Sequence, residues 1–364
     1  MRNTLEIRLD VVRKNFQTIC SALSPMQAMA VLKADAYGLG VKRIFQCLYD
    51  SGCRKFGVAD LQEALEICGD THDTYILGDF ISTEIEGIVA NDIVAPVTSA
   101  DQAAALNLEA QKQGKKVKVH FLIDTGMGRL GISYESAFRE ICRCYQFDNL
   151  QLTGIYSHFP HAYADQDFSN KQVIIFKELL ERLQSAGITF EEIHIANSDG
   201  IHNIDKSRAQ PFNMARTGIN LYGCFDLEGN RTLDLEPVIT LKSKLVARRE
   251  LKEGEAIGYG RTVVLNEDKL IGTVAIGYAD GLPMSLSNSG YLIVRGVKCP
   301  ILGRVSMDYT TVDLSGVPDA SCGDDVICLG KDMPVSEWAV SAGTITYDII
   351  CSIGSRVKRV YLHG

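Results

Sequence analysis

The sequence predicts an α/β protein in which an N-terminal (β/α)8 barrel of the TIM type is followed by a mostly β C-terminal domain. Two observations predict the barrel: eight strand-like runs alternate with helix-like runs up to about residue 225, and no long structureless gap separates them. A third observation predicts the second domain, because from about residue 235 short apolar runs are broken by glycine, proline and asparagine. We place the barrel in residues 10–234 and the β domain in residues 235–364. An N-terminal strand in residues 1–9 is expected to become part of the β domain.

Apolar runs and their spacing define the individual elements. The barrel strands are expected at residues 28–33, 55–58, 74–77, 92–97, 116–123, 150–157, 191–196 and 214–222. Helices are expected at residues 10–23, 41–50, 61–68, 99–113, 134–145 and 168–186. In the β domain we expect strands at residues 238–251, 271–276, 290–297, 299–306, 311–313 and 324–329, and one helix near 336–342.

The composition is that of a globular protein that acts on small molecules. Of the 364 residues, 46% are hydrophobic and 23% are charged, and the formal net charge of -8 argues against a nucleic-acid partner. The 11 cysteines include no CxxC pair, which favours reduced thiols and a cytoplasmic location over a disulfide framework or a zinc site. No apolar run reaches the length of a membrane span, so we expect no membrane contact, although a chain excised from a membrane-anchored protein would read the same way.

Lys33 stands at the end of the first expected barrel strand. The apolar run before it is short and well bounded, and Gly38 and Gly40 supply the turn that follows. The C-terminal ends of barrel strands carry the chemistry of this fold, and a partly desolvated lysine can form a Schiff base with a carbonyl. The alternative is a lysine whose amine reaches solvent from the strand end.

A glycine-rich turn after the fifth strand, DTGMGRLG at residues 124–131, projects Arg129 toward the same end of the barrel. An arginine there offers a planar fork for a carboxylate or an aromatic oxyanion. The alternative is a surface turn with a solvated arginine.

The last three strands end in polar groups. His158 follows the sixth strand, and the segment HIANSDG at residues 194–200 closes the seventh with Ser198. Ser198, Gly218 and Ile219 stand where such barrels commonly hold a phosphate, in the last two loops. A histidine at a strand end can equally be a satisfied structural residue.

Three further side chains need an explanation. Arg216 lies in an otherwise apolar eighth strand and therefore requires a partner, which a structural ion pair would also supply. Tyr259 stands between two glycines in IGYGRT, and Tyr278 follows a glycine in IGYADG, which is also common for plain turn residues. Neither GYG segment is a dinucleotide-binding fingerprint.

In order along the chain, the motifs VLKADAYGLG, DTGMGRLG, YSHF, HIANSDG, MARTGINLYG, IGYGRT, IGYADG and GRVSMD resemble the alanine racemase family of fold type III pyridoxal-phosphate enzymes. The resemblance extends from about residue 5 to residue 359. It implies that Lys33 holds the cofactor aldehyde as a Schiff base, and that Arg216 donates to the pyridine nitrogen and leaves it unprotonated. The residues implied to bind the cofactor phosphate are Tyr37, Ser198, Gly218 and Ile219.

The same resemblance implies a head-to-tail homodimer with shared active sites and a two-base racemisation of a small amino acid. Lys33 would serve the D-enantiomer, and Tyr259 of the partner subunit would serve the L-enantiomer, helped by a hydrogen-bonded chain through His158 to Arg216. The residues implied to bind substrate are Arg129, Met307, Tyr278 and Asp308. No metal site is expected.

Two departures from the family pattern bear on the substrate. Many members carry a carbamylated lysine where this chain has Leu122, so Arg129 must be oriented in another way. Where the family pattern has a tyrosine before Arg-Val, this chain has Ser355, which we expect to widen the pocket. The resemblance implies alanine as the substrate and D-alanine for peptidoglycan as the product. Ser355 raises the alternative of serine racemisation, alone or beside alanine as in vancomycin resistance.

Two other enzyme or protein classes share the barrel. Amino-acid decarboxylases with the same two-domain plan lack an equivalent of Tyr259, and non-catalytic pyridoxal-phosphate carriers lack a second domain. A metal-dependent enzyme is disfavoured, because the sequence has no histidine and carboxylate cluster with ligand spacing.

Overall fold

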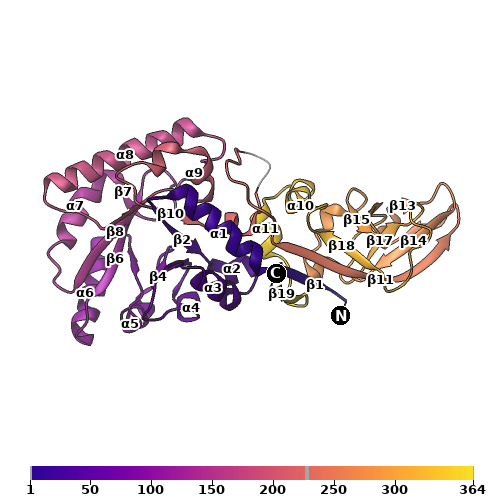
Figure 1. Cartoon of the computed structure of the whole chain (residues 1–364), viewed down its shortest axis with the longest axis horizontal. Coiled ribbons are helices and arrows are strands. Elements are labelled where there is room, and N and C mark those ends of the chain that lie inside the picture. Colours follow the sequence, from indigo (N-terminus) through magenta and orange to yellow (C-terminus); the bar gives the residue numbers. More distant parts are fainter. Residues whose placement is uncertain (1, 226–228, 364) are drawn as a thin grey trace.

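The computed structural model describes residues 2–225 and 229–363, with a helix-covered barrel at one end of the molecule and a β domain at the other (Figure 1). Eight parallel strands form the barrel in the order β4-β3-β2-β10-β9-β8-β6-β5. These strands are β2 (Gln27–Val31), β3 (Lys55–Val58), β4 (Asp73–Ile76), β5 (Ala95–Val97), β6 (Val117–Asp124), β8 (Leu150–Tyr156), β9 (Glu192–His194) and β10 (Met214–Thr217).

The ring of strands closes beside the start of β5. The Val94 N–H donates to the Thr74 carbonyl at 2.9 Å, and the Ile76 N–H donates to the Val94 carbonyl at 3.1 Å. The predicted barrel is therefore confirmed. The short β7 (Ile132–Ser133) adds to β6 outside the ring order.

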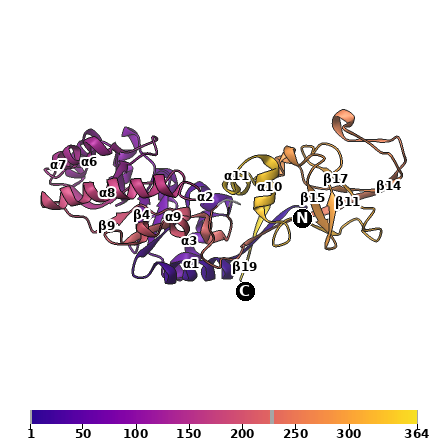
Figure 2. The same ribbon diagram turned by 90° about the horizontal axis from the view of Figure 1, so that it is seen from above.

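Helices cover the outside of the barrel (Figure 2). They are α1 (Leu9–Leu23), α3 (Val41–Asp50), α4 (Leu61–Leu65), α5 (Ile85–Ala90), α6 (Ala100–Gln113), α7 (Tyr134–Cys144), α8 (Gln166–Ser185) and α9 (Ser198–Asn203). Local sequence fixes several of their ends. For α6, the Ser99 hydroxyl accepts the Gln102 N–H at 3.1 Å, and Gly114 ends the helix with φ +66°. For α8, the Asp165 side chain accepts the Phe168 N–H at 2.9 Å.

Several expected strands are shorter than predicted, and a glycine explains two of them. The eighth barrel strand ends at Thr217, because Gly218 turns the chain into the 3-10 helix η3 (Ile219–Tyr222). In the β domain, the strand predicted at residues 299–306 is wrong beyond Pro300, where β16 (Val297–Pro300) ends. Gly303 there has φ +81°, a conformation that leaves the strand, and an added Cβ would lie 3.0 Å from the Ile257 carbonyl oxygen.

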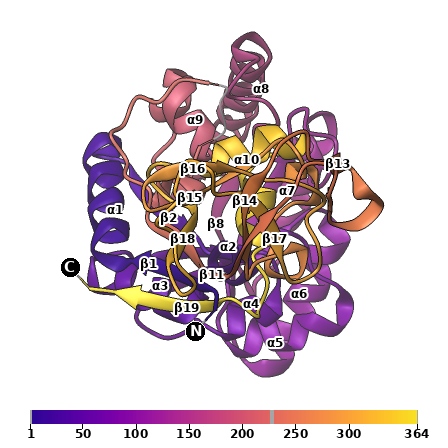
Figure 3. The ribbon, with the colours of Figure 1, turned by 90° about the vertical axis from the view of Figure 1, so that its right-hand side faces the viewer.

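The β domain is built around the long strand β11 (Ile239–Leu251), which pairs with β1, β14 and β18 (Figure 3). The strand β1 (Thr4–Arg8) lies between β11, to which it is antiparallel, and β19, to which it is parallel. The remaining elements of this domain are β12 (Ala256–Ile257), β13 (Val263–Val264), β14 (Lys269–Val274), β15 (Tyr291–Val294), β17 (Thr310–Asp313), β18 (Asp325–Leu329), α10 (Val335–Ala342), α11 (Thr346–Cys351) and β19 (Lys358–Leu362). The division of the chain between residues 234 and 235 stays a prediction.

Arg359 of β19 joins the two domains through backbone carbonyls. Its Nε donates to the carbonyl of Gly38 in the barrel at 3.0 Å. Its two terminal nitrogens donate to the β-domain carbonyls of Ile353, Gly354 and Val357 at 2.6, 2.6 and 2.8 Å. One guanidinium therefore ties the segment after Lys33 to the end of the chain.

Within residues 2–225 and 229–363, no helix combines the length and the apolar character that a membrane crossing requires.

Candidate active site

A cavity of about 610 Å³ opens at the C-terminal ends of the barrel strands. It is lined by seven of the side chains or backbone positions singled out from the sequence. These seven are Lys33, Tyr37, Arg129, His158, Ser198, Arg216 and Gly218. Ile219 is the next residue after Gly218 and is buried.

Lys33 lies just beyond the end of β2 rather than on the strand. The strand stops at Val31, and Lys33 opens the short segment α2 (Lys33–Gly38). Within it, the four residues Ala34–Tyr37 have φ between 54° and 61°, which makes one left-handed turn without glycine. Such backbone costs about 1–2 kcal/mol per residue, so tertiary contacts must hold it.

Glu63 of α4 is one of the groups that hold this turn. One of its carboxylate oxygens accepts the Ala34 N–H at 2.6 Å, and the other accepts the Ala59 N–H at 2.8 Å. At the other end of the turn, the Asp35 carboxylate accepts the Val41 N–H at 2.7 Å. The strained turn is therefore fixed on both sides, and with it the backbone position of Lys33.

The environment of Lys33 favours a neutral amine. Burial lowers the pKa of the Lys33 ammonium, and the positive charge of Arg129 lowers it further. A neutral amine is the form that condenses with an aldehyde or accepts a proton.

Hydroxyl groups and backbone amides gather at one side of the cavity. The Gly218 N–H donates to the Ser198 hydroxyl at 3.1 Å. A Cβ added at Gly218 would lie 2.1 Å from the Tyr37 hydroxyl oxygen, so only glycine leaves room for this tyrosine. Burial raises the pKa of Tyr37, so its hydroxyl keeps its proton and can donate. The Tyr347 ring of α11 lies 5.9 Å from the Tyr37 ring and lines the same cavity.

Arg216 is buried and has three kinds of partner. One terminal nitrogen lies 2.5 Å from Nδ1 of His194. The other donates to the carbonyls of Ser157 and Ile195 at 2.8 and 3.1 Å, and lies 3.1 Å from Nδ1 of His158. Burial lowers the pKa of Arg216 to about 10, so the guanidinium stays protonated at neutral pH.

These contacts leave two N–H groups of Arg216 without a partner in the described part of the chain, the Nε–H and the second N–H of the nitrogen that contacts His194. In the part of the chain that the structure describes, the Nε–H of Arg216 makes no hydrogen bond, and the residue lines the cavity. Burial and the charges of Arg216 and Arg129 hold the pKa of His158 well below its usual range, so this imidazole is neutral.

The loop that carries Arg129 is held by Asp124. One carboxylate oxygen of Asp124 accepts the backbone N–H groups of Gly126 and Met127, both at 2.9 Å. The guanidinium of Arg129 has no hydrogen bond or ion pair to any residue in the ranges 2–225 and 229–363. Leu122, in place of a lysine, lines the cavity as an apolar residue. The arginine is thus positioned by its loop and is open to an anionic ligand.

Four other predicted site residues lie in the β domain, outside this cavity. Tyr259 begins the 3-10 turn η4 (Tyr259–Arg261) and is 74% exposed. Tyr278 begins η5 (Tyr278–Asp280), and its N–H donates to the Ser306 carbonyl at 3.0 Å. Met307 and Asp308 come directly after Ser306 in the sequence, so they lie beside Tyr278 on the β domain. All four residues are at least partly exposed.

The expectation that Ser355 widens the cavity stays a prediction. Ser355 is exposed and does not line the cavity, and Gly354 before it donates to the Asp280 carbonyl at 3.2 Å in the β domain. Tyr347, which lies eight residues earlier in the sequence, contributes an aromatic ring to the cavity lining.

Sequence reasoning missed Tyr347, Glu63, His194 and Asp124 as parts of the site. Tyr347 sits at the start of a helix of six residues, too short for a periodic signal. His194 and Asp124 were within quoted motifs but had no assigned contact. Asp124 had a usable signal, because an aspartate two residues before a glycine commonly accepts the backbone N–H groups of its own turn.

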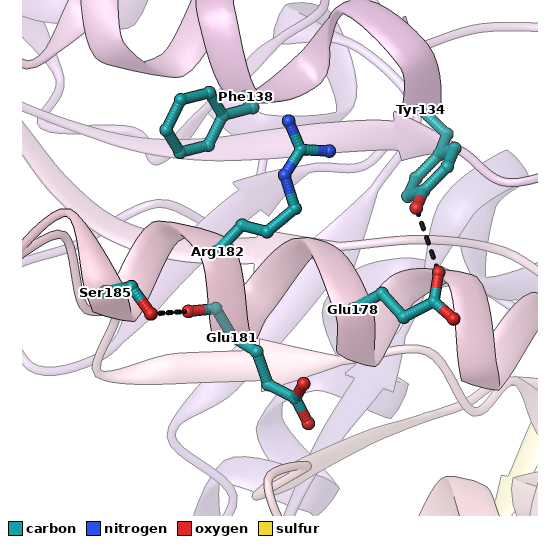
Figure 4. Close-up of a pocket in the computed structure, with 6 residues that line it drawn as sticks. All are labelled: Tyr134, Phe138, Glu178, Glu181, Arg182 and Ser185. Carbon is teal, nitrogen blue, oxygen red and sulfur yellow. Dashed lines mark hydrogen bonds between the residues drawn. The ribbon is translucent and has the colours of Figure 1, made fainter.

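A second hollow lies on the barrel surface between α7 and α8 (Figure 4). Its polar groups partner one another: the Tyr134 hydroxyl donates to the Glu178 carboxylate at 3.1 Å, and the Arg182 guanidinium lies 4.8 Å from the Phe138 ring. It contains none of the residues singled out from the sequence. Nowhere in the described ranges do three or more histidine, cysteine, aspartate or glutamate side chains form a cluster suited to a metal ion.

Comparisons with known proteins agree on one family. The family model described as alanine racemase, N-terminal domain, matches residues 7–226, and the one described as alanine racemase, C-terminal domain, matches residues 238–361. Alanine racemase 2 of Caldanaerobacter subterraneus subsp. tengcongensis is 35% identical over 99% of this chain and 94% of its own length.

Solved structures are similar over the whole chain. The alanine racemase of Clostridium difficile 630 matches with a TM-score of 0.94 and 30% identity, covering 100% of this chain and 96% of its own. The alanine racemase of Bartonella henselae, solved with covalently bound pyridoxal phosphate, matches with a TM-score of 0.90 and 28% identity, covering 100% of both chains.

Proposed function

This chain belongs to the alanine racemase family, and we propose that it is a pyridoxal-phosphate-dependent racemase that interconverts L-alanine and D-alanine. The observation that carries the proposal is the convergence of three groups in one barrel cavity: the Lys33 amine, the hydroxyl and amide groups around Gly218, and the Nε–H of Arg216.

The donor set of the cavity fits pyridoxal phosphate. The Tyr37 and Ser198 hydroxyls and the amides of Gly218 and Ile219 suit a phosphate, and the absence of a Cβ at Gly218 leaves space beside Tyr37. Lys33 would hold the aldehyde carbon, and Arg216 would donate to the ring nitrogen. When bound, the cofactor supplies an electron-accepting ring that weakens the Cα–H bond of an attached amino acid.

We assign the two proton transfers to Lys33 and to Tyr259 of the partner subunit. One base takes the proton from Cα, and the other returns a proton to the opposite face, so that no atom is gained or lost and no electron leaves the substrate. Lys33 Nζ serves the D-enantiomer, and its lowered pKa increases the neutral form that can accept a proton. The hydroxyl of Tyr259 serves the L-enantiomer.

The other polar groups orient the substrate. Arg129 is open to the substrate carboxylate, because it has no partner within the described part of the chain. His158 accepts from Arg216 and would continue a hydrogen-bonded chain to Tyr259 of the partner subunit. Tyr278, Met307 and Asp308 would line the entrance of the partner's site.

A homodimer with shared sites completes this proposal. The barrel cavity contains one of the two bases, and the second lies on the β domain with 74% of its surface exposed. An exposed tyrosine between two glycines is accessible for insertion into a partner's cavity. In the same proposal, the enzyme works in the cytoplasm and supplies D-alanine for peptidoglycan.

Alanine is favoured over serine as the substrate. The expectation of serine racemisation depended on Ser355, which is exposed and does not line the cavity. Racemisation of L-alanine and L-serine by the wild type and by Ser355→Tyr tests this choice. We expect a strong preference for L-alanine and a ratio that Ser355→Tyr changes by less than about twofold, within the range of small pocket effects. If Ser355→Tyr instead strongly lowered the rate with L-serine relative to L-alanine, position 355 would be part of the substrate pocket.

Mixing two inactive variants tests the shared site. Lys33→Ala and Tyr259→Phe should each abolish racemisation, and their mixed dimer should contain one intact and one doubly altered site. After dissociation and reassociation of equal amounts, we expect about a quarter of the wild-type activity, because half of the dimers are mixed and each has one working site. No recovery would contradict the shared site, and activity in Lys33→Ala alone would contradict the role of Lys33.

A further inference from the structure

The interior of the barrel contains a row of polar side chains that the proposed reaction does not use. Barrel interiors of this type are usually filled by layers of branched apolar residues. Here Glu192, His120 and His194 are in contact in sequence from the N-terminal end of the strands up to Arg216. His120, His194 and Arg216 are each no more than 3% exposed.

Two contacts of this row, His120 with His194 and His194 with Arg216, are hydrogen bonds, whereas His120 and Glu192 meet at an ion-pair distance without hydrogen-bond alignment. Nε2 of His120 lies 3.0 Å from a Glu192 carboxylate oxygen, and Nδ1 of His120 lies 3.2 Å from Nε2 of His194. Nδ1 of His194 lies 2.5 Å from a terminal nitrogen of Arg216. Stacking of His194 on the Tyr156 ring, with centroids 4.9 Å apart and planes 7° apart, fixes the ring in this orientation.

The chain also makes room for the row. Gly154 of β8 lies between its members, and an added Cβ would stand 2.4 Å from two atoms of the His120 ring. Its backbone is ordinary strand, so the need for glycine here is steric and comes from His120.

Glu192 is charged at the outer end of the row. Lys55 forms an ion pair with it, and the Tyr75 hydroxyl donates to it at 2.9 Å. Although burial opposes the charge, His120 and Lys55 lower the pKa of Glu192 to about 2. Burial lowers the pKa values of His120 and His194, so both imidazoles are neutral at physiological pH.

Only one arrangement of protons satisfies all of these contacts. Arg216 can only donate and an ionised Glu192 can only accept. His194 must therefore accept at Nδ1 and carry its proton on Nε2, and His120 must accept at Nδ1 and carry its proton on Nε2. A second proton on either ring, or the other tautomer, would set two donors against each other.

We propose that Glu192 and His120 are positioning residues which, through the tautomer of His194, fix Arg216 as the N–H donor of the active-site cavity. The carboxylate at the far end of the barrel favours a proton on Nε2 of His120, which agrees with the direction that the donor-only Arg216 imposes from the other end. With its terminal nitrogens held by His194 and His158, Arg216 keeps its Nε–H toward the cavity. The inference rests on the proposed function for its effect on racemisation, but the tautomers follow from the contacts alone.

Replacement of Glu192 by glutamine would reverse this direction. The amide oxygen must face Lys55, which can only donate, so the amide NH2 would face Nε2 of His120. His120 would then carry its proton on Nδ1 and donate to His194, whose own proton would be forced toward Arg216. One hydrogen bond of Arg216 would be lost.

The test reads the tautomers by nitrogen NMR of the holoenzyme labelled with 15N-histidine, with the signals assigned from His120→Gln and His194→Gln variants. In the wild type we expect both rings neutral with the proton on Nε2. In Glu192→Gln we expect the His120 proton on Nδ1 and a fall in kcat of about 10- to 100-fold. The matched control is Glu191→Gln, which removes the same charge from an exposed side chain one residue away and should leave tautomers and kcat unchanged.

The outcomes separate the two proposals. A wild-type imidazolium, or a proton on Nδ1 of either ring, overturns the row, as does a Glu192→Gln variant with unchanged tautomers and kcat. If Glu192→Gln does not fold, Gly154→Ala replaces it as the test, because the added methyl must displace His120 and leaves every charge in place. Unchanged His194 signals in the Gly154→Ala variant would also overturn the proposal. If the protein shows the expected tautomers but does not racemise alanine, the proposal about the row of side chains stands and the proposed function is wrong.

Discussion

Replacing Arg359 by methionine should destabilise the protein strongly, although this residue touches no substrate. The guanidinium makes four hydrogen bonds to backbone carbonyls, one in the barrel and three in the β domain. A net contribution of roughly 0.5–1.5 kcal/mol per hydrogen bond gives about 2–6 kcal/mol. Because the residue is only half-buried and water replaces part of the loss, we expect the free energy of unfolding to fall by about 3 kcal/mol.

Urea unfolding measures this loss. The only tryptophan, Trp338, is buried in α10 and reports on the β domain by its fluorescence. The matched control is Lys358→Met, which removes an exposed positive charge from the neighbouring position of β19 and should cost less than about 0.5 kcal/mol. Equal unfolding free energies for the Arg359→Met and Lys358→Met variants would refute the role of Arg359 as the link between the domains.

Three further predictions concern the barrel. The pKa of Glu192 is lowered from 4.5 to about 2, so its charge stabilises the fold by at most about 3 kcal/mol above pH 4.5, and this contribution disappears as the pH falls toward 2. The difference in unfolding free energy between wild type and Glu192→Gln should therefore shrink from pH 6 to pH 3. A constant difference would contradict this prediction. Gly218→Ala should weaken cofactor binding at least about tenfold in an absorbance titration, because the Cβ would lie 2.1 Å from the Tyr37 hydroxyl, whereas Gly316→Ala, with its nearest neighbour at 3.7 Å, should bind normally. Glu63→Gln should lower the free energy of unfolding by about 1–3 kcal/mol, since an amide NH2 would face a backbone N–H that the carboxylate now accepts; an unchanged urea midpoint would argue against it.

The sequence was most informative where local pattern and tertiary role coincide. The alternation of apolar runs predicted the eight barrel strands, and helix α3 begins and ends where its periodicity indicated. Lys33 and Arg216 stood out because a charged residue at or inside an apolar strand needs a reason. Both line the cavity.

The rest depends on contacts between distant residues. Nothing in Ala34–Tyr37 indicates a left-handed turn, because alanine and tyrosine disfavour it and Glu63 of another element holds it. His120 and Glu192 read as ordinary strand residues until the barrel brings them within 3.0 Å. The expectation at Ser355 followed the spacing to Arg-Val and stays a prediction, while Tyr347, on the preceding short helix, could not be anticipated as a ring of the cavity.

The position of β1 between β11 and β19 has a consequence for biosynthesis. Thr4 pairs with Lys358 and Arg8 with Leu362, so one sheet joins two segments that lie far apart in the sequence and are therefore synthesised at different times. The barrel strands lie within residues 27–217 and can assemble while translation continues. The β domain cannot complete its sheet until residue 362 has emerged, and until then the edge of β1 is an unpaired strand that nascent chains must keep from associating with one another.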